Sequence, residues 1–501
     1  METLDLLMQG FAGALTPMNL MWVVIGCLLG TAVGVLPGLG SSMAVALLLP
    51  MTFALDPTAA FILFAGVYFG GLFGDSTMAI LLNTPGQASA IASTFEGHRM
   101  ANAGRAPQAL ATAAIGAFIG GMISSVLVVF VSPSLVEFSS MFGPEEFFAL
   151  AMFAFIATAS VVSDNVLKGL ASLVLGLGIT VVGVDSVSGV ERFTLGLPEL
   201  FEGISLVTVT VAVLALGEVL YIASRVRRDR EDLQVRKAGR GFLSRQEFLE
   251  AAPAWGRGTV IGLPFGVIPA GGAEIPTFIS YDVERRLDRR RKKPKFGTGA
   301  IRGLAAPEAA GNATTGMAMG ALLALGLPIS ATAAIMLAAL QQYGLQPGPL
   351  LFEQSADLVW ALLASFFIAM VVLLAINLPF AQLWSKLLLI PKHYLYGGIT
   401  LFCGLGIYAT AASVFDLVLL LIIGIIGFVM RRYDYPLAPL MIGMVLGPLA
   451  ETSLRDALLA SVGDPVTLVT GWITWVIYAL LLLVVGASAW GALRKRTQRD
   501  V

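Results

Sequence analysis

The chain has little charge and lacks the motifs that carry most enzyme chemistry. Only 13% of its 501 residues are charged, whereas a soluble globular chain carries roughly a quarter. It has two histidines, His98 and His393, and neither an H-E-x-x-H zinc motif nor a phosphate-binding G-x-x-x-x-G-K-[ST] motif. These absences argue against a zinc protease and a motor ATPase, and a membrane aspartyl protease is disfavoured because Asp75 has no obvious acidic partner. We expect a protein that is not an enzyme and has no cofactor.

Positive charge is also absent from the beginning of the chain, and cysteine is scarce. Residues 1–98 contain no Lys or Arg, so the start lacks the positive region of a cleavable signal peptide. Cys27 and Cys403 each lie in an apolar stretch, and we interpret them as buried residues rather than as a disulfide. The net charge of −1 gives no reason to expect a nucleic-acid partner.

Long apolar runs are abundant. Hydrophobic residues make up 57% of the chain, and a run of about 20 such residues can cross a bilayer. Eighteen of the 31 Lys and Arg residues lie between Arg225 and Arg302, and four more follow residue 490. Because positive loops mark the cytoplasmic side, we expect a bacterial inner-membrane protein with a cytoplasmic C-terminus; Arg455 is the one clear exception, placed outside. The expected spans include 108–131, 146–163, 169–184, 203–223, 357–376, 394–412, 416–430, 436–450 and 466–490, with periplasmic loops at 132–145 and 185–202.

Two apolar segments are interrupted by Pro and Gly at matching places. GTAVGVLPGLG (30–40) aligns without a gap to GLPFGVIPAGG (262–272), and LLNTPGQASA (81–90) and LALGLPISAT (323–332) follow in the same order. Because Pro and Gly break helices, each interrupted segment is predicted to form a re-entrant hairpin. The alternative, two spans in the second segment, would leave about 13 residues for each arm, too few to cross. The second hairpin has basic flanks and the first has only Asp56, which predicts that they enter from opposite faces.

These features predict an all-α polytopic membrane protein with about 11 spans and two re-entrant hairpins in an inverted-topology repeat. Inverted repeats with broken helices are typical of secondary transporters, and the breaks mark the binding site. A channel is the alternative. The expected organisation is a first half at 1–223 (hairpin near 20–55, broken helix 59–98), a basic cytoplasmic linker at 224–254, a second half at 255–490 (hairpin 255–281, broken helix 302–345) and a cytoplasmic tail at 491–501.

The interrupted segments are rich in Gly, Ser, Thr and Asn and contain no Lys or Arg. Glycine lets the backbone approach a ligand closely, and an anion there would be held by backbone N–H groups and helix N-termini. The alternative is that these small residues only pack helices together. The candidate substrate-binding residues are Pro37, Gly38, Gly40, Ser41, Ser42, Asn83, Thr84, Pro85, Gly86, Ser89, Pro269, Gly271, Gly272, Glu274, Pro328 and Ser330.

Asp75 and Glu308 are carboxylates expected inside the membrane, where a charge is expensive and usually functional. We expect both in non-helical breaks, FGDST (73–77) and EAAGNATT (308–315), whose oxygen atoms suit Na⁺ as a coupling ion. The alternative is that Asp75 carries a proton, so coupling to H⁺ stays open. The candidate cation-binding residues are Asp75, Ser76, Glu308, Gly311, Asn312, Thr314 and Thr315.

At these motifs the sequence resembles the TctA family, the large permease subunit of tripartite tricarboxylate transporters. Matching stretches include GVLPGLGSSMAVALLLP (34–50), GVYFGGLFGDSTMAILLNTPG (66–86), GVIPAGGAEIPTFISY (266–281) and GAIRGLAAPEAAGNATTG (299–316). The resemblance implies import of carboxylates, driven by an ion gradient without ATP. It also implies two partners, a small four-helix membrane subunit (TctB-like) and a periplasmic solute-binding protein (TctC-like). Asp75 and GLPIS (326–330) depart from the family pattern, so the identity of the carboxylate substrate stays open. A TRAP-type or other secondary carboxylate permease with different substrates is the alternative.

Overall fold

The computed structural model describes residues 2–36, 39–161, 165–185, 188–225, 242–268, 272–289, 295–387 and 392–497. Nearly all of its elements are helices, which confirms the all-α prediction. In the described ranges the strands are β1 (Gly183–Val184) and β2 (Glu191–Arg192), an antiparallel pair. The helices are α1 (Glu2–Ala14), α2 (Pro17–Val35), α3 (Ser41–Thr52), α4 (Pro57–Leu82), η1 (Ala88–Ala90), α5 (Ile91–Met100), η2 (Ala101–Arg105), α6 (Ala106–Ser139), α7 (Pro144–Val161), α8 (Val166–Thr180), η3 (Pro198–Leu200), α9 (Leu206–Thr210), η4 (Val211–Leu216), α10 (Gly217–Arg225), α11 (Arg245–Phe265), α12 (Glu274–Arg289), α13 (Ile301–Leu325), α14 (Ala331–Gln342), α15 (Pro349–Gln354), α16 (Ala356–Asn377), α17 (Ala381–Leu387), α18 (Lys392–Ala411), α19 (Val414–Arg432), α20 (Leu437–Ala460), η5 (Pro465–Val469) and α21 (Trp472–Thr497).

Many helices are suited to a bilayer. Within the described residues, 8 helical segments are long and apolar enough to cross a membrane, with mean hydropathy between 1.2 and 2.8. The chain is therefore a multi-pass membrane protein. These segments are Pro17–Val35, Pro57–Leu82, Ala88–Ser139, Leu206–Ser224, Ala356–Asn377, Tyr394–Ala411, Val414–Arg432 and Leu437–Ala460, and shorter apolar helices lie at 41–52, 166–180, 331–342 and 472–486.

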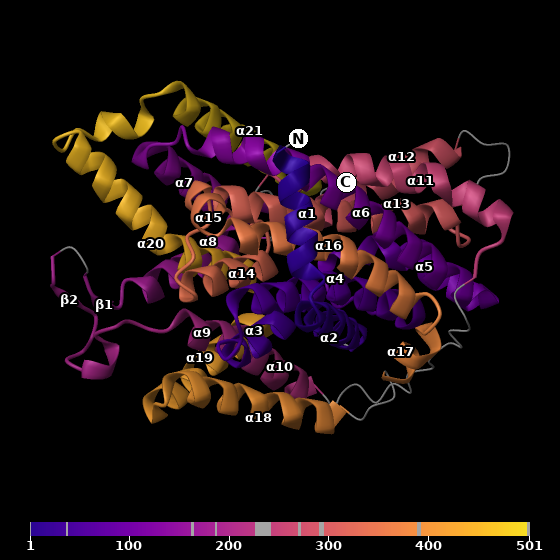
Figure 1. Cartoon of the computed structure of the whole chain (residues 1–501), viewed down its shortest axis with the longest axis horizontal. Helices are drawn as coiled ribbons and strands as arrows, with labels where there is room; N and C mark the ends of the chain where they lie inside the picture. Colours follow the sequence, from indigo (N-terminus) through magenta and orange to yellow (C-terminus); the bar gives the residue numbers. More distant parts are fainter. Residues whose placement is uncertain are drawn as a thin grey trace.

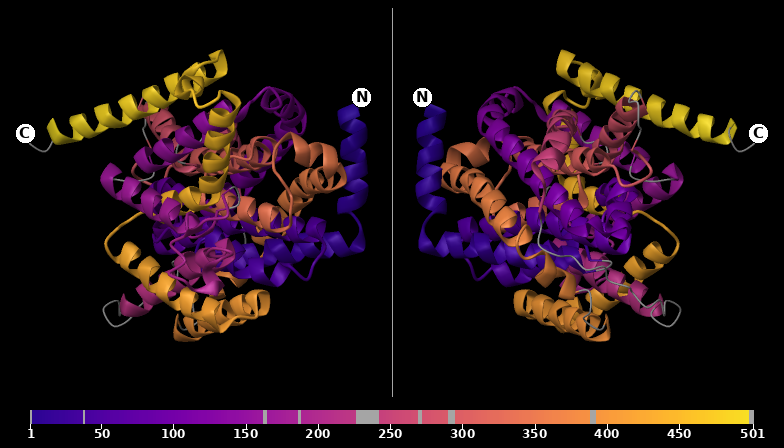
Figure 2. Two further views of the ribbon diagram at one scale, coloured as in Figure 1. Left: turned by 90° about the vertical axis from the view of Figure 1, so that its left-hand side faces the viewer. Right: turned by 90° about the vertical axis from the view of Figure 1, so that its right-hand side faces the viewer.

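The helices form three groups (Figures 1 and 2). A central group, α2–α6 with α11–α16, contains both interrupted segments. One peripheral group, α7, α8, α20 and α21, lies toward the upper left of Figure 1, and another, α9, η4, α10, α18 and α19, lies along the lower edge. The β1–β2 strand pair lies at the left end of Figure 1 and α5 at the right end.

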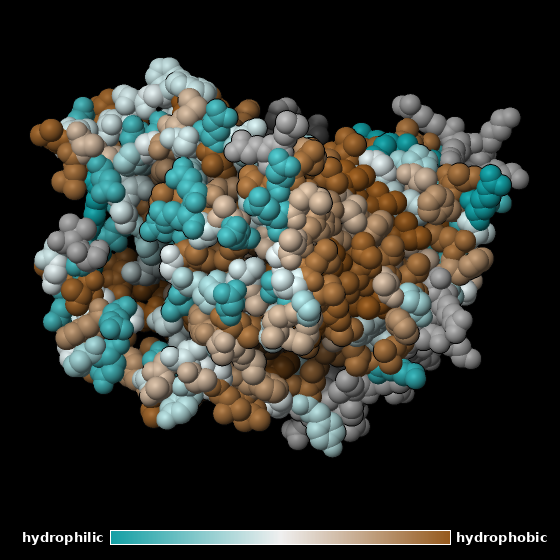
Figure 3. Space-filling view, in the orientation of Figure 1, coloured by the Kyte–Doolittle hydropathy of each residue, from teal (hydrophilic) through white to brown (hydrophobic). Residues whose placement is uncertain are grey.

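The surface is strongly apolar over part of the molecule. Figure 3 shows an extended hydrophobic area on the right half of this face, where Figure 1 places α6 and α16. On these two helices Ile123, Val126, Phe130 and Val371 are exposed large hydrophobic side chains. An apolar area of this kind suits contact with lipid tails or with another membrane helix.

The first arm of the first interrupted segment, α2, packs directly on α4. Three glycines on α2, spaced four residues apart, face the α4 backbone. A Cβ at each of them would come within 2.2–2.4 Å of a carbonyl oxygen, so only glycine fits. The facing pairs are Gly26 with Leu63, Gly30 with Val67, and Gly34 with Gly71.

The second interrupted segment repeats this packing. Two glycines on α11 and its C-cap, Gly266, face the α13 backbone, and a Cβ at each would lie 2.2–2.6 Å from a carbonyl oxygen. The glycines on α2 and α11 occupy corresponding positions in the sequence alignment, and their partners are also evenly offset along α4 and α13. The two hairpin arms thus pack in the same way. The second set of pairs is Gly258 with Ala306, Gly262 with Ala310, and Gly266 with Thr314.

The expected positions of the helix breaks were wrong in two places. FGDST (73–77) lies inside continuous α4, and EAAGNATT (308–315) lies inside continuous α13. The helices instead end at Asn83 and Gly326, both in the left-handed conformation, with φ of 58° and 67°. The polar residues within α13 do not break it because their side chains hydrogen-bond to carbonyls of the preceding turn, as Thr315 does to Gly311 (2.9 Å).

One further expectation needs revision, and one group of candidate residues lies outside the described part of the chain. The basic linker at 224–254 is not all linker, because α11 begins at Arg245 with a capping box formed by Ser244 and Glu247. The hairpin-tip candidates Pro37, Gly38, Pro269 and Gly271 lie outside the described residues.

Arg455, the exception to the charge pattern, is paired within the fold. It makes hydrogen-bonded contacts of 2.9 and 3.0 Å to Asp185 and an ion pair of 2.7 Å to Glu451. Arg192 on β2 joins both acids as well. The two carboxylates balance the charges of the two arginines. The positive charge of Arg455 is therefore paired within the fold and does not act as an unpaired signal for membrane orientation.

Candidate functional site

Four polar pieces of the chain meet at one cavity of about 210 Å³. They are the beginning of α3, the loop after α4, the beginning of α12 and the loop between α13 and α14. Helices α7 and α20, from the upper peripheral group, close its other side. The lining residues are Ser42, Tyr68, Leu72, Gln87, Ala88, Ser89, Thr158, Gly272, Ala273, Glu274, Thr315, Ile329, Ser330, Ala331, Thr332, Ala438 and Ile442.

Hydroxyl groups connect these pieces to one another. The Ser41 hydroxyl lies 3.0 Å from that of Thr332 and donates to Gln87 Oε1 at 3.3 Å. The Tyr68 hydroxyl on α4 lies 3.1 Å from that of Ser330, which also caps α14. The first interrupted segment is therefore hydrogen-bonded to the break in the second half of the chain.

The cavity offers neutral donors rather than positive side chains. Among the described residues that line it there is no Lys or Arg. Gln87 Nε2 is buried and makes no hydrogen bond to any described residue. Helices α3, α12 and α14 all begin beside the cavity, so their N-terminal N–H groups add partial positive charge there. Glu274 is the lining carboxylate, and it adds an acceptor at the start of α12.

Five of the candidate substrate-binding residues line this cavity: Ser42, Ser89, Gly272, Glu274 and Ser330. Ser41 lies behind them in the hydroxyl network, and Gly40 is the N-cap of α3.

The other described candidates do not line the cavity. Asn83 and Thr84 are exposed at the end of α4, and Thr84 donates to the Leu82 carbonyl. Pro85, Gly86 and Pro328 shape the two loops without lining the cavity. Sequence reasoning missed Tyr68, Thr158 and Thr332. Thr332, Gln87 and Tyr68 lay inside quoted motifs, whereas Thr158 sits in an apolar helix that gave no signal.

A second, smaller cavity of about 20 Å³ lies beside the first. Leu72 and Ser89 line both cavities. Ser76 on α4 donates a 2.7 Å hydrogen bond to Glu308 Oε2 on α13, which joins the two long helices across this cavity. Its lining residues are Leu72, Asp75, Ser76, Ser89, Ala90, Ser93, Thr277, Pro307, Glu308, Gly311 and Asn312.

The candidate cation-binding residues divide into two kinds. Asp75, Ser76, Glu308, Gly311 and Asn312 line the smaller cavity. The other two do not. Thr315 lines the larger cavity. Thr314 donates from α13 to the carbonyl of Gly262 at 2.9 Å and so holds the hairpin arm in place.

Asp75 has a structural role that the sequence did not reveal. Its Oδ1 accepts a hydrogen bond from the Gly86 N–H at 2.5 Å, and its Oδ2 accepts one from the Gln87 N–H at 3.0 Å. Both oxygens are thus engaged by the loop that follows α4. The carboxylate holds this loop in place and orients Gln87 toward the larger cavity.

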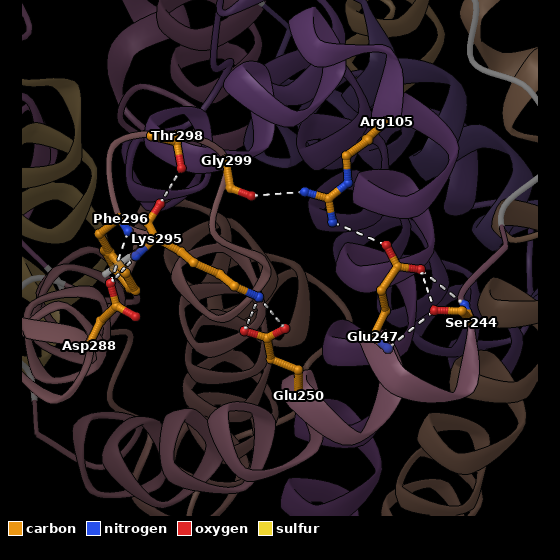
Figure 4. Close-up of polar contacts among 9 residues, drawn as sticks. All are labelled: Arg105, Ser244, Glu247, Glu250, Asp288, Lys295, Phe296, Thr298 and Gly299. Atoms are coloured by element: carbon orange, nitrogen blue, oxygen red, sulfur yellow. Dashed lines mark hydrogen bonds and ion pairs between the residues drawn. The ribbon is translucent and has the colours of Figure 1, made fainter. Parts of the chain in front are cut away.

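The base of the second interrupted segment is tied down by charged residues (Figure 4). Arg105 donates to Glu247 on α11 at 3.1 Å and to a carbonyl of the loop before α13 at 3.2 Å. Lys295 pairs with Glu250 at 2.9 Å, and Asp288 accepts two backbone N–H groups of the same loop. Burial opposes ionisation of Glu247, but hydrogen bonds from the α11 N-cap and Arg105 outweigh it and lower the pKa.

Buried carboxylates also fix the beginning of α13. Glu96 on α5 accepts hydrogen bonds from the backbone N–H groups of Gly297, Gly299 and Ala300 at 2.7–2.8 Å. These groups precede the first turn of α13, where a negative charge is favourable. The base of the segment is therefore firmly joined to α5, η2 and α13.

Comparisons with known proteins agree with this geometry. A family described as "Tripartite tricarboxylate transporter TctA family" matches residues 20–442. The chain is 39% identical over 490 residues to an Agrobacterium vitis protein described as "Uncharacterized 52.8 kDa protein in TAR-I ttuC' 3'region", covering 97% of this chain and 95% of that one. It is 38% identical over 209 residues to "Uncharacterized protein in TAR-II ttuC' 3'region" from Agrobacterium vitis, covering 42% of this chain and 86% of that one. The chain belongs to the tripartite tricarboxylate transporter TctA family, a family of transporter subunits.

Proposed function

We propose that this protein is the large permease subunit of an ion-gradient-driven importer of tricarboxylates or related carboxylates in the bacterial inner membrane. It works with a small four-helix membrane subunit and a periplasmic solute-binding protein, and its C-terminus is cytoplasmic. The observation that carries the proposal is the meeting of four polar chain segments at one 210 Å³ cavity in a TctA-family protein. Broken helices that meet in this way are typical of substrate sites in secondary transporters.

The donor set of the larger cavity fits a carboxylate substrate. Hydroxyls of Ser42, Ser330 and Thr332, the Gln87 amide and three helix N-termini can donate to carboxylate oxygens. Neutral donors bind an anion less tightly than arginines would, which favours release on the far side. Glu274 can accept a hydrogen bond from a substrate hydroxyl, so hydroxy-carboxylates fit the lining better than unsubstituted ones.

The fold supports alternating access. The two interrupted segments share the same glycine packing on α4 and α13, as expected of a repeat, and their charge flanks favour opposite orientations. Two such units can expose one central site to either face in turn. A coupling cation, Na⁺ or H⁺, would supply the driving force by favouring substrate binding in one state.

The decisive test is uptake by the reconstituted complex. Proteoliposomes containing this chain and its small membrane subunit, with the binding protein outside, should accumulate radiolabelled citrate only when an inward Na⁺ or H⁺ gradient is imposed. Accumulation against a gradient would exclude a channel. Competition with a panel of mono-, di- and tricarboxylates defines the substrate class, and preference for a monocarboxylate would show that the substrate is not a tricarboxylate. Failure of every carboxylate to accumulate under either gradient would overturn the proposal.

A further inference from the structure

We propose that the smaller cavity is a Na⁺ site whose principal ligands are Glu308 and Asn312, and that Asp75 is a support for the neighbouring loop rather than an ion ligand. This deepens the proposed function and rests on it for the role of the ion in uptake. The binding of Na⁺ itself can be tested without transport.

The first observation is a pair of buried oxygen atoms. Glu308 Oε1 and Asn312 Oδ1 make no hydrogen bond of ordinary length and angle to any residue that the structure describes, although the Ser93 hydroxyl lies close to Glu308. The two residues are only 5% and 3% exposed. Leaving a buried acceptor without a donor is costly, and the cost is largest for a carboxylate. A bound cation would satisfy both oxygens at once.

The second observation is that both side chains face one cavity. Glu308 and Asn312 are one turn apart on α13, so they lie on the same helix face. Asn312 Nδ2 donates to the Glu308 carbonyl at 3.1 Å, which fixes its amide with Oδ1 available. The cavity of about 20 Å³ has room for one water-sized species, which suits a single dehydrated ion.

The remaining wall supplies further oxygen ligands. Hydroxyls of Ser76, Ser89, Ser93 and Thr277 line the same cavity. Ser76 already donates to Glu308 Oε2 at 2.7 Å, so its oxygen lone pairs stay free to face a cation. Together with Glu308 and Asn312 they form an all-oxygen set from α4, η1, α5, α12 and α13.

The charge of this set suits a monovalent hard cation. Asp75 also lines the cavity, but both of its oxygens accept backbone N–H groups, so Glu308 supplies the one carboxylate oxygen there without a hydrogen bond to the described residues. The described residues contain no group of three His, Cys, Asp or Glu side chains that could hold a metal ion. A divalent or transition metal would need more charge or softer ligands.

The position of the site provides a route for coupling. Leu72 and Ser89 line both cavities, and Ser89 lies two residues after Gln87, which faces the larger one. A cation that binds Ser89 would therefore order the η1 segment that forms one wall of the larger cavity. By thermodynamic linkage, bound Na⁺ would then raise the affinity for substrate, and substrate would raise the affinity for Na⁺ to the same degree.

The test is Na⁺-dependent thermal stabilisation of the purified membrane complex, titrated at constant ionic strength against choline chloride. The wild type should be stabilised in a saturable way. Glu308→Gln and Asn312→Ala should each raise the Na⁺ concentration for half-maximal stabilisation at least tenfold. Glu308→Asp, which keeps the charge, should raise it less; elution of each variant as a single size-exclusion peak confirms folding.

Two matched controls separate ion binding from packing. Thr314→Val removes a hydroxyl on the same helix that lines neither cavity, and it should leave the Na⁺ dependence unchanged. Asp75→Asn should lower stability in all solutions without shifting the Na⁺ concentration dependence. A wild type stabilised by protons and not by Na⁺, or a Glu308→Gln variant with an unchanged Na⁺ response, would overturn the assignment.

Citrate uptake in the same preparations distinguishes this inference from the proposed function. If the wild type accumulates citrate but shows no Na⁺ response, the Na⁺ site is wrong and the transport function stands. If Na⁺ binds through Glu308 and no carboxylate is accumulated, the site stands and the transport function is wrong.

Discussion

The hydroxyl oxygens of Ser41 and Thr332 lie 3.0 Å apart, although 291 residues separate them in the chain. Ser41 begins α3, and Thr332 lies in the first turn of α14. The contact joins the first interrupted segment to the break in the second half, at the wall of the larger cavity. Any movement that opens this cavity between the two halves must break or replace this pair.

The first prediction concerns Gln87, which lines the larger cavity and has an amide donor without a hydrogen bond to the described residues. Gln87→Ala should raise the KM for citrate uptake about tenfold, because one hydrogen bond to a charged group contributes about 1.5–3 kcal/mol. The KM is measured from initial uptake rates over a range of concentrations of the citrate-loaded binding protein. Thr84→Ala, an exposed hydroxyl on the same loop, is the matched control and should keep the wild-type KM. Equal KM values for both variants would remove Gln87 from the substrate site.

A second prediction concerns the structural role of Asp75. Asp75→Asn should destabilise the protein by about 1–3 kcal/mol, because at least one buried backbone N–H, of Gly86 or Gln87, loses its acceptor. Thermal unfolding followed by intrinsic fluorescence in detergent gives the change. Asn83→Gly, which keeps the left-handed conformation at the end of α4, is the control and should unfold like the wild type. Unchanged stability of Asp75→Asn would mean that the loop does not depend on this carboxylate.

The equivalent packing of α2 and α11 leads to a third prediction. Gly30→Ala and Gly262→Ala should destabilise the protein to a similar degree, about 1–3 kcal/mol each, because each new Cβ would meet a carbonyl oxygen within 2.4 Å. Gly256→Ala, also on α11 but with open space around it, should be neutral or slightly stabilising. The measurement is again the thermal unfolding midpoint. A large effect at only one of the two sites would show that the two arms are not equivalent in energy.

Opposite orientation of the two interrupted segments gives a fourth prediction. Single cysteines at Ala54 and Arg286, both exposed, should react with a membrane-impermeant maleimide from the periplasm and from the cytoplasm, respectively. Arg286 is a better probe than Asp288, which is buried and holds the loop before α13. The native Cys27 and Cys403 are buried and give little background. Labelling of both probes from the same side would rule out an inverted repeat.

Sequence alone determined the class of the protein and where its polar interruptions fall. Sparse charge and long apolar runs are sufficient for an all-α membrane protein, because a bilayer accepts few other structures. The spacing of the Gly and Pro motifs also located the four segments that meet at the larger cavity. Local composition carries this information, since Gly, Pro and small polar residues restrict the backbone wherever they stand.

Tertiary structure decided which residues share a site and what each one does there. Tyr68 and Thr158 join the larger cavity only because distant helices pack beside it, and the sequence did not mark either residue as part of a site. Asp75 and Glu308 look alike in the sequence, as carboxylates within apolar stretches of the chain. One is fully engaged by backbone N–H groups, and the other keeps an oxygen without a hydrogen bond to the described residues. That difference depends on the neighbours that folding brings to each carboxylate, and a sequence pattern does not contain them.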